Sequence, residues 1–158
     1  MYSEINTDQL GQAGEYVLSD VELVSFQAAD GQRPKRISIR SLVSEVNVYE
    51  ALDQKNLSGT VILTDAQNVI GHLPLTGFER IEFKLFTPGT SRGYDFTFET
   101  GHPMFIYKIA DRTGVSPRTQ MYKLHFCSPE MIVNEQVKVE RAFTNTYDNN
   151  VISVFRNE

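Results

Sequence analysis

The 158-residue sequence has no tryptophan, only one cysteine and no long hydrophobic run. A single cysteine cannot form an intrachain disulfide, which is typical of proteins made in a reducing compartment. No stretch approaches the ~20 apolar residues of a membrane-spanning helix, and the polar N-terminus lacks the apolar segment of a signal peptide. We therefore expect a soluble protein that is made in a cytoplasm.

Clustered basic residues are also scarce. The chain has 15 Lys and Arg against 20 Asp and Glu, a formal net charge of −5, and its cations are dispersed. The only basic cluster is "RPKR" at Arg33 to Arg36, which follows Asp30-Gly31 and is interpreted as a solvated turn. A nucleic-acid-binding surface needs clustered cations, so this function is disfavoured.

Short segments of alternating polarity recur along the chain. They predict strands near 16–26 (broken at Ser19-Asp20), 37–50 (with a phase slip near Arg40-Ser41), 57–64, 79–86, 94–99, 104–110, 119–127 and 136–143. The expected strands at 57–64 and 79–86 each have one polar face, as antiparallel strands do. Strand after strand with few helices between indicates a mainly β (β-rich α+β) fold, an antiparallel barrel or sandwich.

Three short helices are expected beside these strands. The first is capped by Asp65 and ended by Pro74, and the second is capped by Ser128 with Pro129 at its first position. A third begins near residue 145 and carries an apolar stripe to the end of the chain. This stripe indicates either that the natural chain continues or that the helix packs on another chain.

The pentapeptide "GTSRG", residues 89–93, matches the G-x-S-x-G pattern of a nucleophile elbow with Ser91 at its centre. In an elbow the serine lies between a strand and a helix, whereas this segment leads into another strand. A hairpin loop is therefore the preferred interpretation.

The histidines and the cysteine have no catalytic or metal-binding spacing. His72, His102 and His125 are too far apart in sequence for ligands held on one element, although the fold could still bring them together. Cys127 follows Phe126 in a strand pattern and is interpreted as an apolar core residue.

The acidic residues are spread evenly. Asp95 and Glu99 would lie ~13 Å apart along one strand, too far for a pair of catalytic carboxylates. Charges such as Glu82 and Lys84 are interpreted as solvated side chains on a polar strand face. We assign no catalytic, cofactor-binding or metal-binding residue and expect that the protein is not an enzyme.

Two segments together resemble a known family. The first includes "VNVYEAL" and "LSGTVILTDAQNVIGHLPLTGFERIEFKLFTPG", and the second is "FCSPEMIVNEQVKVERAF". The order of the residues in these segments resembles that in the N-terminal tube-type β-barrel domain of a baseplate hub protein, from contractile-tailed, T-even-like bacteriophages. The resemblance covers roughly residues 21–155. The residues that carry the resemblance are Tyr49, Glu50, Gly59, Asp65, Asn68, Leu73, Pro74, Gly77, Glu79, Phe86, Pro88, Ser128, Pro129 and Glu130.

The resemblance implies a structural virion protein of the tail baseplate, assembled in the host cytoplasm and without an active site or cofactor. Such hubs form a homotrimeric, pseudo-sixfold ring that joins the tail tube to the central spike, with DNA only passing through its lumen and no membrane binding. The polar residues 1–13 independently predict a flexible arm. The resemblance implies the barrel over 14–143 and, over 144–158, the start of a helix that leads to a further region.

Two points stay open. An acidic excess would repel DNA in a lumen, and the row Arg80, Glu82 and Lys84 is a candidate for its wall.

The alternative functions are a cytoplasmic hydrolase that uses Ser91 or a histidine-centred site, and a generic ligand-binding β domain such as a carbohydrate-binding module. The lack of tryptophan disfavours the second alternative.

Overall fold

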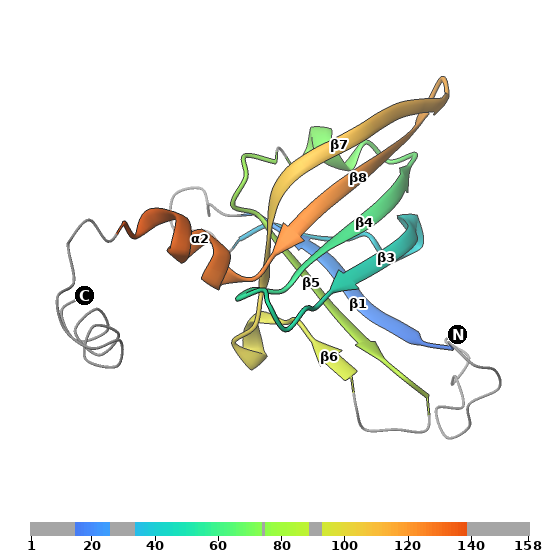
Figure 1. The fold of residues 1–158 in the computed structure, drawn as a ribbon. Coiled ribbons are helices and arrows are strands. Elements are labelled where there is room, and N and C mark those ends of the chain that lie inside the picture. The colour runs from blue at the N-terminus through green and yellow to red at the C-terminus, as the bar shows by residue number, and fades with distance from the viewer. Residues whose placement is uncertain (1–14, 26–33, 74, 89–92, 139–158) are drawn as a thin grey trace, which may run out of the picture.

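The computed structural model describes residues 15–25, 34–73, 75–88 and 93–138 (Figure 1). The expected arm over 1–13, the third helix near residue 145, Pro74 and Ser91 lie outside the described residues. Within them the chain is mainly β, with eight strands in one antiparallel sheet and two short α-helices, which confirms the expected fold class. No helix in this part of the chain is long and apolar enough to span a membrane.

The elements follow one another as a series of strands with brief helical interruptions. In chain order they are β1 (Val17–Val24), β2 (Arg36–Ser38), the 3₁₀ turn η2 (Arg40–Leu42), β3 (Val43–Tyr49), β4 (Ser58–Asp65), α1 (Val69–His72), β5 (Arg80–Phe86), β6 (Gly93–Asp95), the 3₁₀ turn η3 (Phe98–Thr100), β7 (Met104–Ser116), β8 (Thr119–Cys127) and α2 (Pro129–Gln136).

The sheet consists of two halves. The pairing order β2-β1-β5-β7-β8-β4-β3, with β6 beside β5, places β2 and β3 at opposite ends although η2 alone separates them in the chain. We call β2, β1, β5 and β6 the first half, and β3, β4, β8 and β7 the second half. Only two residue pairs, Arg80 with Phe105 and Ile81 with Met104, join them through β5 and β7. Figure 1 shows the second half fanned out above β1 and β5.

The turn η2 explains the phase slip at Arg40-Ser41. The backbone N–H of Ile39 donates to the carbonyl of Val21, and that of Leu42 donates to Ile39. Ile39 and Leu42 are both buried in the core. The slip is confirmed, but a 3₁₀ turn between two separate strands causes it, and a single long strand over 37–50 is wrong.

One hydrophobic core lies between the two halves. Alternate residues of β4, β5 and β8 point into it because side chains on a strand alternate between the two faces. Phe83 meets Phe96 and Phe126 edge to face, with ring centroids 4.9 and 5.6 Å apart. The fully buried members include Val21, Leu23, Ile39, Val61, Leu63, Ile81, Phe83, Met104, Ile106, Tyr122, Leu124 and Phe126.

The strand β1 crosses the expected break at Ser19-Asp20 without ending. Its register against β5 shifts between Ser19 and Glu22, and Asp20 has a positive φ of 53°. The break in the hydrophobic pattern is therefore a β-bulge.

Four expected boundaries are wrong. Strand β7 continues to Ser116, six residues beyond the expected end at 110. Helix α1 begins at Val69, four residues after Asp65, because Asp65 still pairs with Gln120 as the last residue of β4. Strand β6 ends at Asp95, and η3 replaces the remainder of the expected strand over 94–99. Helix α2 continues to Gln136, where a strand over 136–143 was expected to begin, and residues 139–143 lie outside the described part.

Candidate functional surfaces

Asp65 fixes the connection from β4 to α1. It is 4% exposed, and its carboxylate accepts hydrogen bonds from the backbone of Gln67 (2.8 Å), the backbone of Val69 (2.8 Å) and the hydroxyl of Tyr122 (3.0 Å). Burial, and then this bond to Asp65, raise the pKa of Tyr122. Asp65 thus satisfies the first N–H of the helix from the strand end, while Asn68 is the N-cap in a left-handed conformation with φ 57°.

Glu79 holds the turn that leads into β5. It is buried and accepts bonds from the backbone and hydroxyl of Thr76 (2.8 and 2.7 Å) and from the backbone of Gly77 (2.9 Å). Burial alone would raise its pKa, but these bonds outweigh burial and lower it. Gly77 has φ 112°, a conformation that side chains rarely adopt. Leu73, between Asp65 and this turn, is a core residue.

The remaining signature residues also have structural positions. A side chain at Gly59 would collide with the ring of Phe126 and the carbonyl of Asn47. The hydroxyl of Tyr94 donates to Glu50 at 2.8 Å, and this bond, followed by burial, raises the pKa of Tyr94. Tyr49 is half-exposed at the end of β3.

The expected start of the second helix is confirmed. Ser128 is the N-cap of α2 and Pro129 occupies the first turn, but the Ser128 side chain makes no capping bond. Pro88 lies in a turn directly after β5.

Ser91 lies outside the described residues, so only the candidate histidines and Cys127 are placed by the structure. Among the described residues no cluster of three or more His, Cys, Asp or Glu could hold a metal ion. Cys127 is fully buried, and burial, followed by the charge of Glu130, raises its pKa to about 11, which makes the thiol unreactive. Burial, followed by the charge of Lys108, lowers the pKa of His125. His72 is the exposed last residue of α1, and His102 is exposed in the segment before β7.

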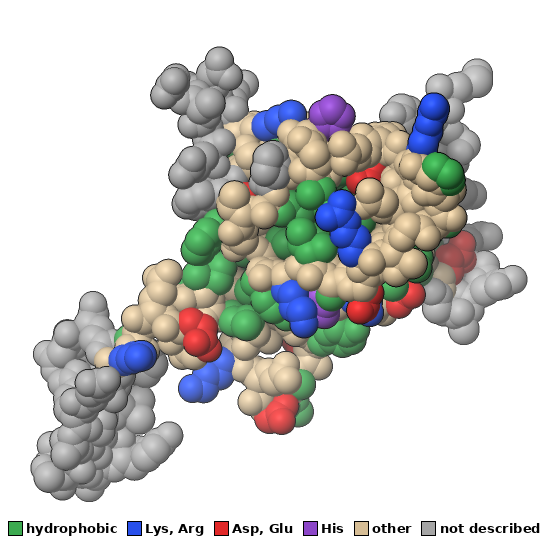
Figure 2. Space-filling view, turned by 90° about the horizontal axis from the view of Figure 1, so that it is seen from above, with side chains coloured by type: hydrophobic (Ala, Val, Ile, Leu, Met, Phe, Trp, Pro, Cys, Tyr) green, Lys and Arg blue, Asp and Glu red, His purple; other side chains and the backbone are tan. Residues whose placement is uncertain are grey.

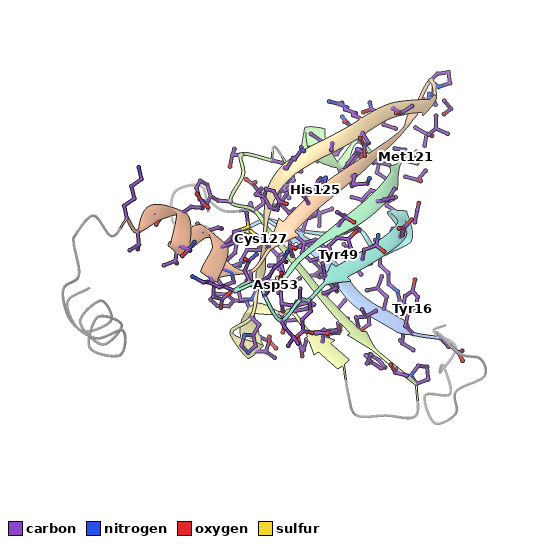
Figure 3. The ribbon with its side chains drawn as sticks, viewed as in Figure 1. Tyr16, Tyr49, Asp53, Met121, His125 and Cys127 are labelled. Atoms are coloured by element: carbon purple, nitrogen blue, oxygen red, sulfur yellow. The ribbon has the colours of Figure 1, made fainter. Side chains whose placement is uncertain are left out.

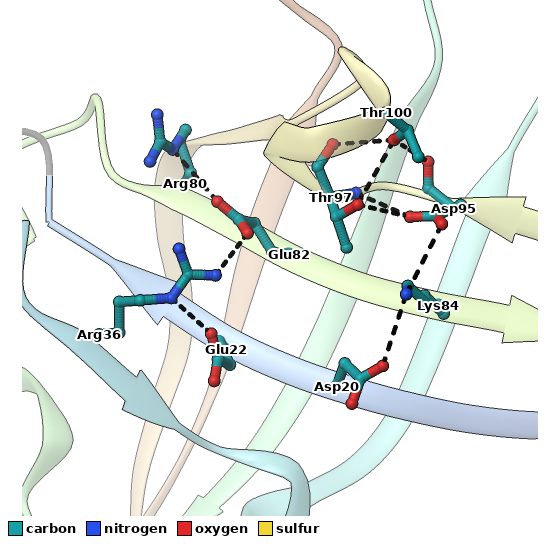
Figure 4. A network of polar contacts seen from close by, with 9 residues as sticks. All are labelled: Asp20, Glu22, Arg36, Arg80, Glu82, Lys84, Asp95, Thr97 and Thr100. Atoms are coloured by element: carbon teal, nitrogen blue, oxygen red, sulfur yellow. Dashed lines mark hydrogen bonds and ion pairs between the residues drawn. The ribbon is translucent and has the colours of Figure 1, made fainter.

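A network of ion pairs covers the outer face of the first half (Figure 4). Glu22 and Glu82 lie directly opposite each other on β1 and β5, an arrangement of like charges that is destabilising by itself. Arg36 of β2 compensates, because its guanidinium contacts Glu22 at 2.7 Å and Glu82 at 2.6 Å. Arg80 approaches Glu82 at 3.4 Å as an ion pair without hydrogen-bond geometry.

The network continues along β5. Lys84 lies between Asp20 and Asp95, 3.8 Å from each. Asp95 also accepts bonds from the backbone and hydroxyl of Thr97. The Phe98 ring of η3 lies under the guanidinium of Arg80, 4.5 Å from ring centroid to carbon.

Two sequence interpretations of these charges are wrong. Glu82 is only 2% exposed, so it is not a solvated side chain. Arg36, the last residue of the "RPKR" cluster, is the first residue of β2 and pairs with Glu82, so it does not belong to a solvated turn. No local signal could have found this pairing, because the two residues lie far apart in the chain.

The outer face of β3, β4 and β8 carries few charges, whereas β7 beside them adds Lys108 opposite His125 and Asp111 paired with Lys123. Core residues such as Val61 and Leu124 point inward, so their strand neighbours point outward. The outward rows across β3, β4 and β8 are Tyr49-Ser58-Cys127, Asn47-Thr60-His125 and Glu45-Ile62-Lys123, of which Cys127 and Thr60 are nevertheless buried. Figure 3 labels Tyr49, His125 and Cys127 of these rows.

The second half also has unpaired strand edges. Among the described strands, β3 pairs only with β4, and β7 beyond Phe105 pairs only with β8. The pairing of β7 with β8 is irregular at three places, whereas β3 from Glu45 to Tyr49 is regular. Seen from above, Lys, Arg, Asp and Glu side chains are scattered among hydrophobic and neutral ones (Figure 2).

Comparisons with protein-family models, curated proteins and solved structures found no match to this chain.

Proposed function

We propose that this chain is the N-terminal barrel domain of a phage baseplate hub, a structural protein that assembles into a homotrimeric, pseudo-sixfold ring between tail tube and central spike in the virion. The proposal rests on the strand, short helix, strand order of the sequence signature and on the surface of the second half of the sheet. In this role the domain acts through geometry and self-association.

The observation that carries the proposal is the weakly charged face of β3, β4 and β8, bounded by a regular β3 edge that has no strand partner among the described residues. An exposed strand edge is a template for pairing with another chain, and proteins usually protect such edges with charges, prolines or bulges. Bulges interrupt β7, but Glu45 to Tyr49 of β3 has no bulge. A neighbouring subunit would cover this edge in a ring.

The first half is a poor candidate for a lumen wall. The row Arg80, Glu82 and Lys84 was the expected candidate, but Glu82 is buried and Phe98 lies against Arg80. In the proposed ring the outward rows of the second half replace it.

The mass of the full-length protein in solution, from size-exclusion chromatography with light scattering, tests the proposal, and electron microscopy of the same fractions identifies rings. We expect a trimer mass. Asn47→Lys, which places a charge on the β3 edge, should reduce assembly, whereas Gln54→Lys in the exposed loop after β3 should not. A strictly monomeric full-length protein contradicts the ring, and normal assembly of Asn47→Lys contradicts the role of the β3 edge.

A further inference from the structure

The far end of the β7–β8 hairpin projects beyond the rest of the sheet (Figure 1). None of its side chains from Tyr107 to Met121 is buried, and beyond Phe105 strand β7 pairs only with β8 among the described strands. A two-stranded hairpin without a packed face is marginally stable at best. Residues 112–120, which we call the hairpin tip, thus have no packing partner within the described part of the chain.

The hairpin tip is basic although the chain as a whole is acidic. It carries Arg112 and Arg118 and no Asp or Glu, whereas the whole chain has a net charge of −5. Arg112 donates to Gln120 at 2.8 Å, while Arg118 is exposed in the turn between the strands and bonds to no other described residue. Bulges along β7 protect its edge from pairing with a further strand. The tip is therefore suited to bind an acidic partner through its side chains.

A hollow of 340 Å³ on the outer face of the first half has the opposite charge. Its walls come from β1, β2, β5 and the segment that follows β6. Four carboxylates and two basic groups line it, an excess of two negative charges, from Asp20, Glu22, Glu82, Glu99, Arg36 and Lys84. The neighbouring Arg80 and Asp95 cancel each other and leave this excess unchanged. The hollow therefore attracts cationic groups.

Glu99 is the carboxylate of this hollow that has no partner. It is exposed in η3 and forms no ion pair or hydrogen bond with another described residue, whereas the two lining glutamates on the strands share Arg36. Phe98 beside it is 59% exposed, although Arg80 lies over its ring. A guanidinium pairs with carboxylates and stacks on aromatic rings, so this corner of the hollow suits an arginine.

We propose that the hairpin tip of one copy binds in this hollow of a second copy, with Arg118 paired to Glu99 beside Phe98. Figure 1 shows the end of the hairpin far from β1 and β6, so one chain cannot make this contact with itself. Each copy offers one tip and one hollow, and the contact is therefore head-to-tail. It does not use the β3 edge, so it does not depend on the proposed ring.

Intermolecular paramagnetic broadening in NMR tests the proposal on the 158-residue chain. Ser116→Cys carries a nitroxide label at the tip, because the natural Cys127 is buried and unreactive. The labelled chain is mixed with an unlabelled ¹⁵N chain. We expect the largest losses of amide intensity at Phe98 and Glu99 of the ¹⁵N chain, and smaller losses at high salt, which screens the charges.

A charge swap provides the matched test. Arg118→Glu in the labelled chain should weaken binding at least about tenfold, because like charges then meet. Glu99→Arg in the ¹⁵N chain should do the same, read at Phe98. Mixing the two variants should restore the broadening, since opposite charges meet again. Lys55→Glu, which changes the net charge equally in an exposed loop, should bind as the unmodified chain does.

Three results would overturn the proposal. They are unmodified chains without intensity losses at the hollow, a Lys55→Glu chain that binds as weakly as Arg118→Glu, and a swapped pair that does not bind. The test is separate from that of the ring, because a failed tip contact leaves the trimer mass unchanged, and a failed β3-edge contact leaves the broadening at Phe98 unchanged.

Discussion

The two halves of the sheet share one core but present different outer faces. On the first half Arg36 bridges two opposed glutamates, and the segment after β6 packs over the network. On the second half the outward rows are mostly uncharged, and the β3 edge is unpaired within the described residues. The charges of the first face are thus paired within the chain, whereas the β3 edge of the second half has no strand partner among the described residues.

Replacing Glu82, the buried carboxylate of the first half, should have the largest effect on stability. Glu82→Ala removes the partner of Arg36 and Arg80 and leaves Arg80, which is mostly buried, without its carboxylate. We expect the free energy of unfolding to fall by about 4 kcal/mol, since breaking a buried ion pair leaves an uncompensated charge. Urea denaturation measures this change.

The matched change on the second half is Glu45→Ala, at an exposed position of β3. It should alter the free energy of unfolding by less than about 0.5 kcal/mol, as surface substitutions do. Equal losses in the two variants would show that the contrast between the halves has no energetic basis.

Asp65 gives the second-largest expected effect, on the inner side of the second half. Asp65→Ala leaves the Tyr122 hydroxyl and the Val69 N–H without their acceptor. Each unsatisfied buried group costs about 1–3 kcal/mol, so we expect a loss of about 3 kcal/mol in urea denaturation. Tyr122→Phe, which removes only one of these bonds, should lose about 1 kcal/mol. A larger loss in Tyr122→Phe than in Asp65→Ala would contradict the assigned roles.

Replacing Glu79, which lies just before β5 of the first half, should have a smaller effect on the free energy of unfolding, and this effect should depend on pH. The pKa of Glu79 is lowered from the ordinary value of 4.5 in the folded chain, so its contribution to stability is present above pH 4.5 and is lost as the pH falls through the folded pKa. Glu79→Gln should therefore be less stable than the unmodified chain at pH 7, and the difference should shrink below pH 4.5. Denaturation at several pH values measures it, and a difference independent of pH would exclude this carboxylate as the cause.

The smallest effect should come from the ion pair of Asp111 and Lys123 on the second half. The pair is short, at 2.8 Å, but the Asp111 side chain is 69% exposed. Water and salt screen such pairs, so Asp111→Asn should leave the denaturation midpoint unchanged. A loss of stability comparable to that of Glu82→Ala would mean that solvent exposure does not determine how much these ion pairs contribute to stability.

Much of the strand pattern could be predicted from the sequence, because alternation reflects one buried face. The strands at 57–64, 79–86 and 119–127 agree with β4, β5 and β8 to within one residue. The bulge in β1 and the slip at Arg40-Ser41 also left visible breaks in the pattern.

Partners that are distant in the chain could not be predicted. Glu82 lies at a position that the alternating pattern of its strand assigns to the solvated face. Only the pairing of β1, β2 and β5 brings Arg36 to it. Aspartate is a favoured N-cap residue, so the sequence placed the start of the helix at Asp65. The pairing of Asp65 with Gln120 keeps it in β4, and α1 begins only at Val69. The hollow beside Glu99 likewise forms from four segments with no shared motif.

The three-residue turn η2 has a consequence for folding. It joins β2 of the first half to β3 of the second half, with Ile39 and Leu42 buried in the core beside it. Neither half can unfold without pulling these side chains out of the core that the other half needs. We therefore expect one cooperative transition, in which the two halves melt together.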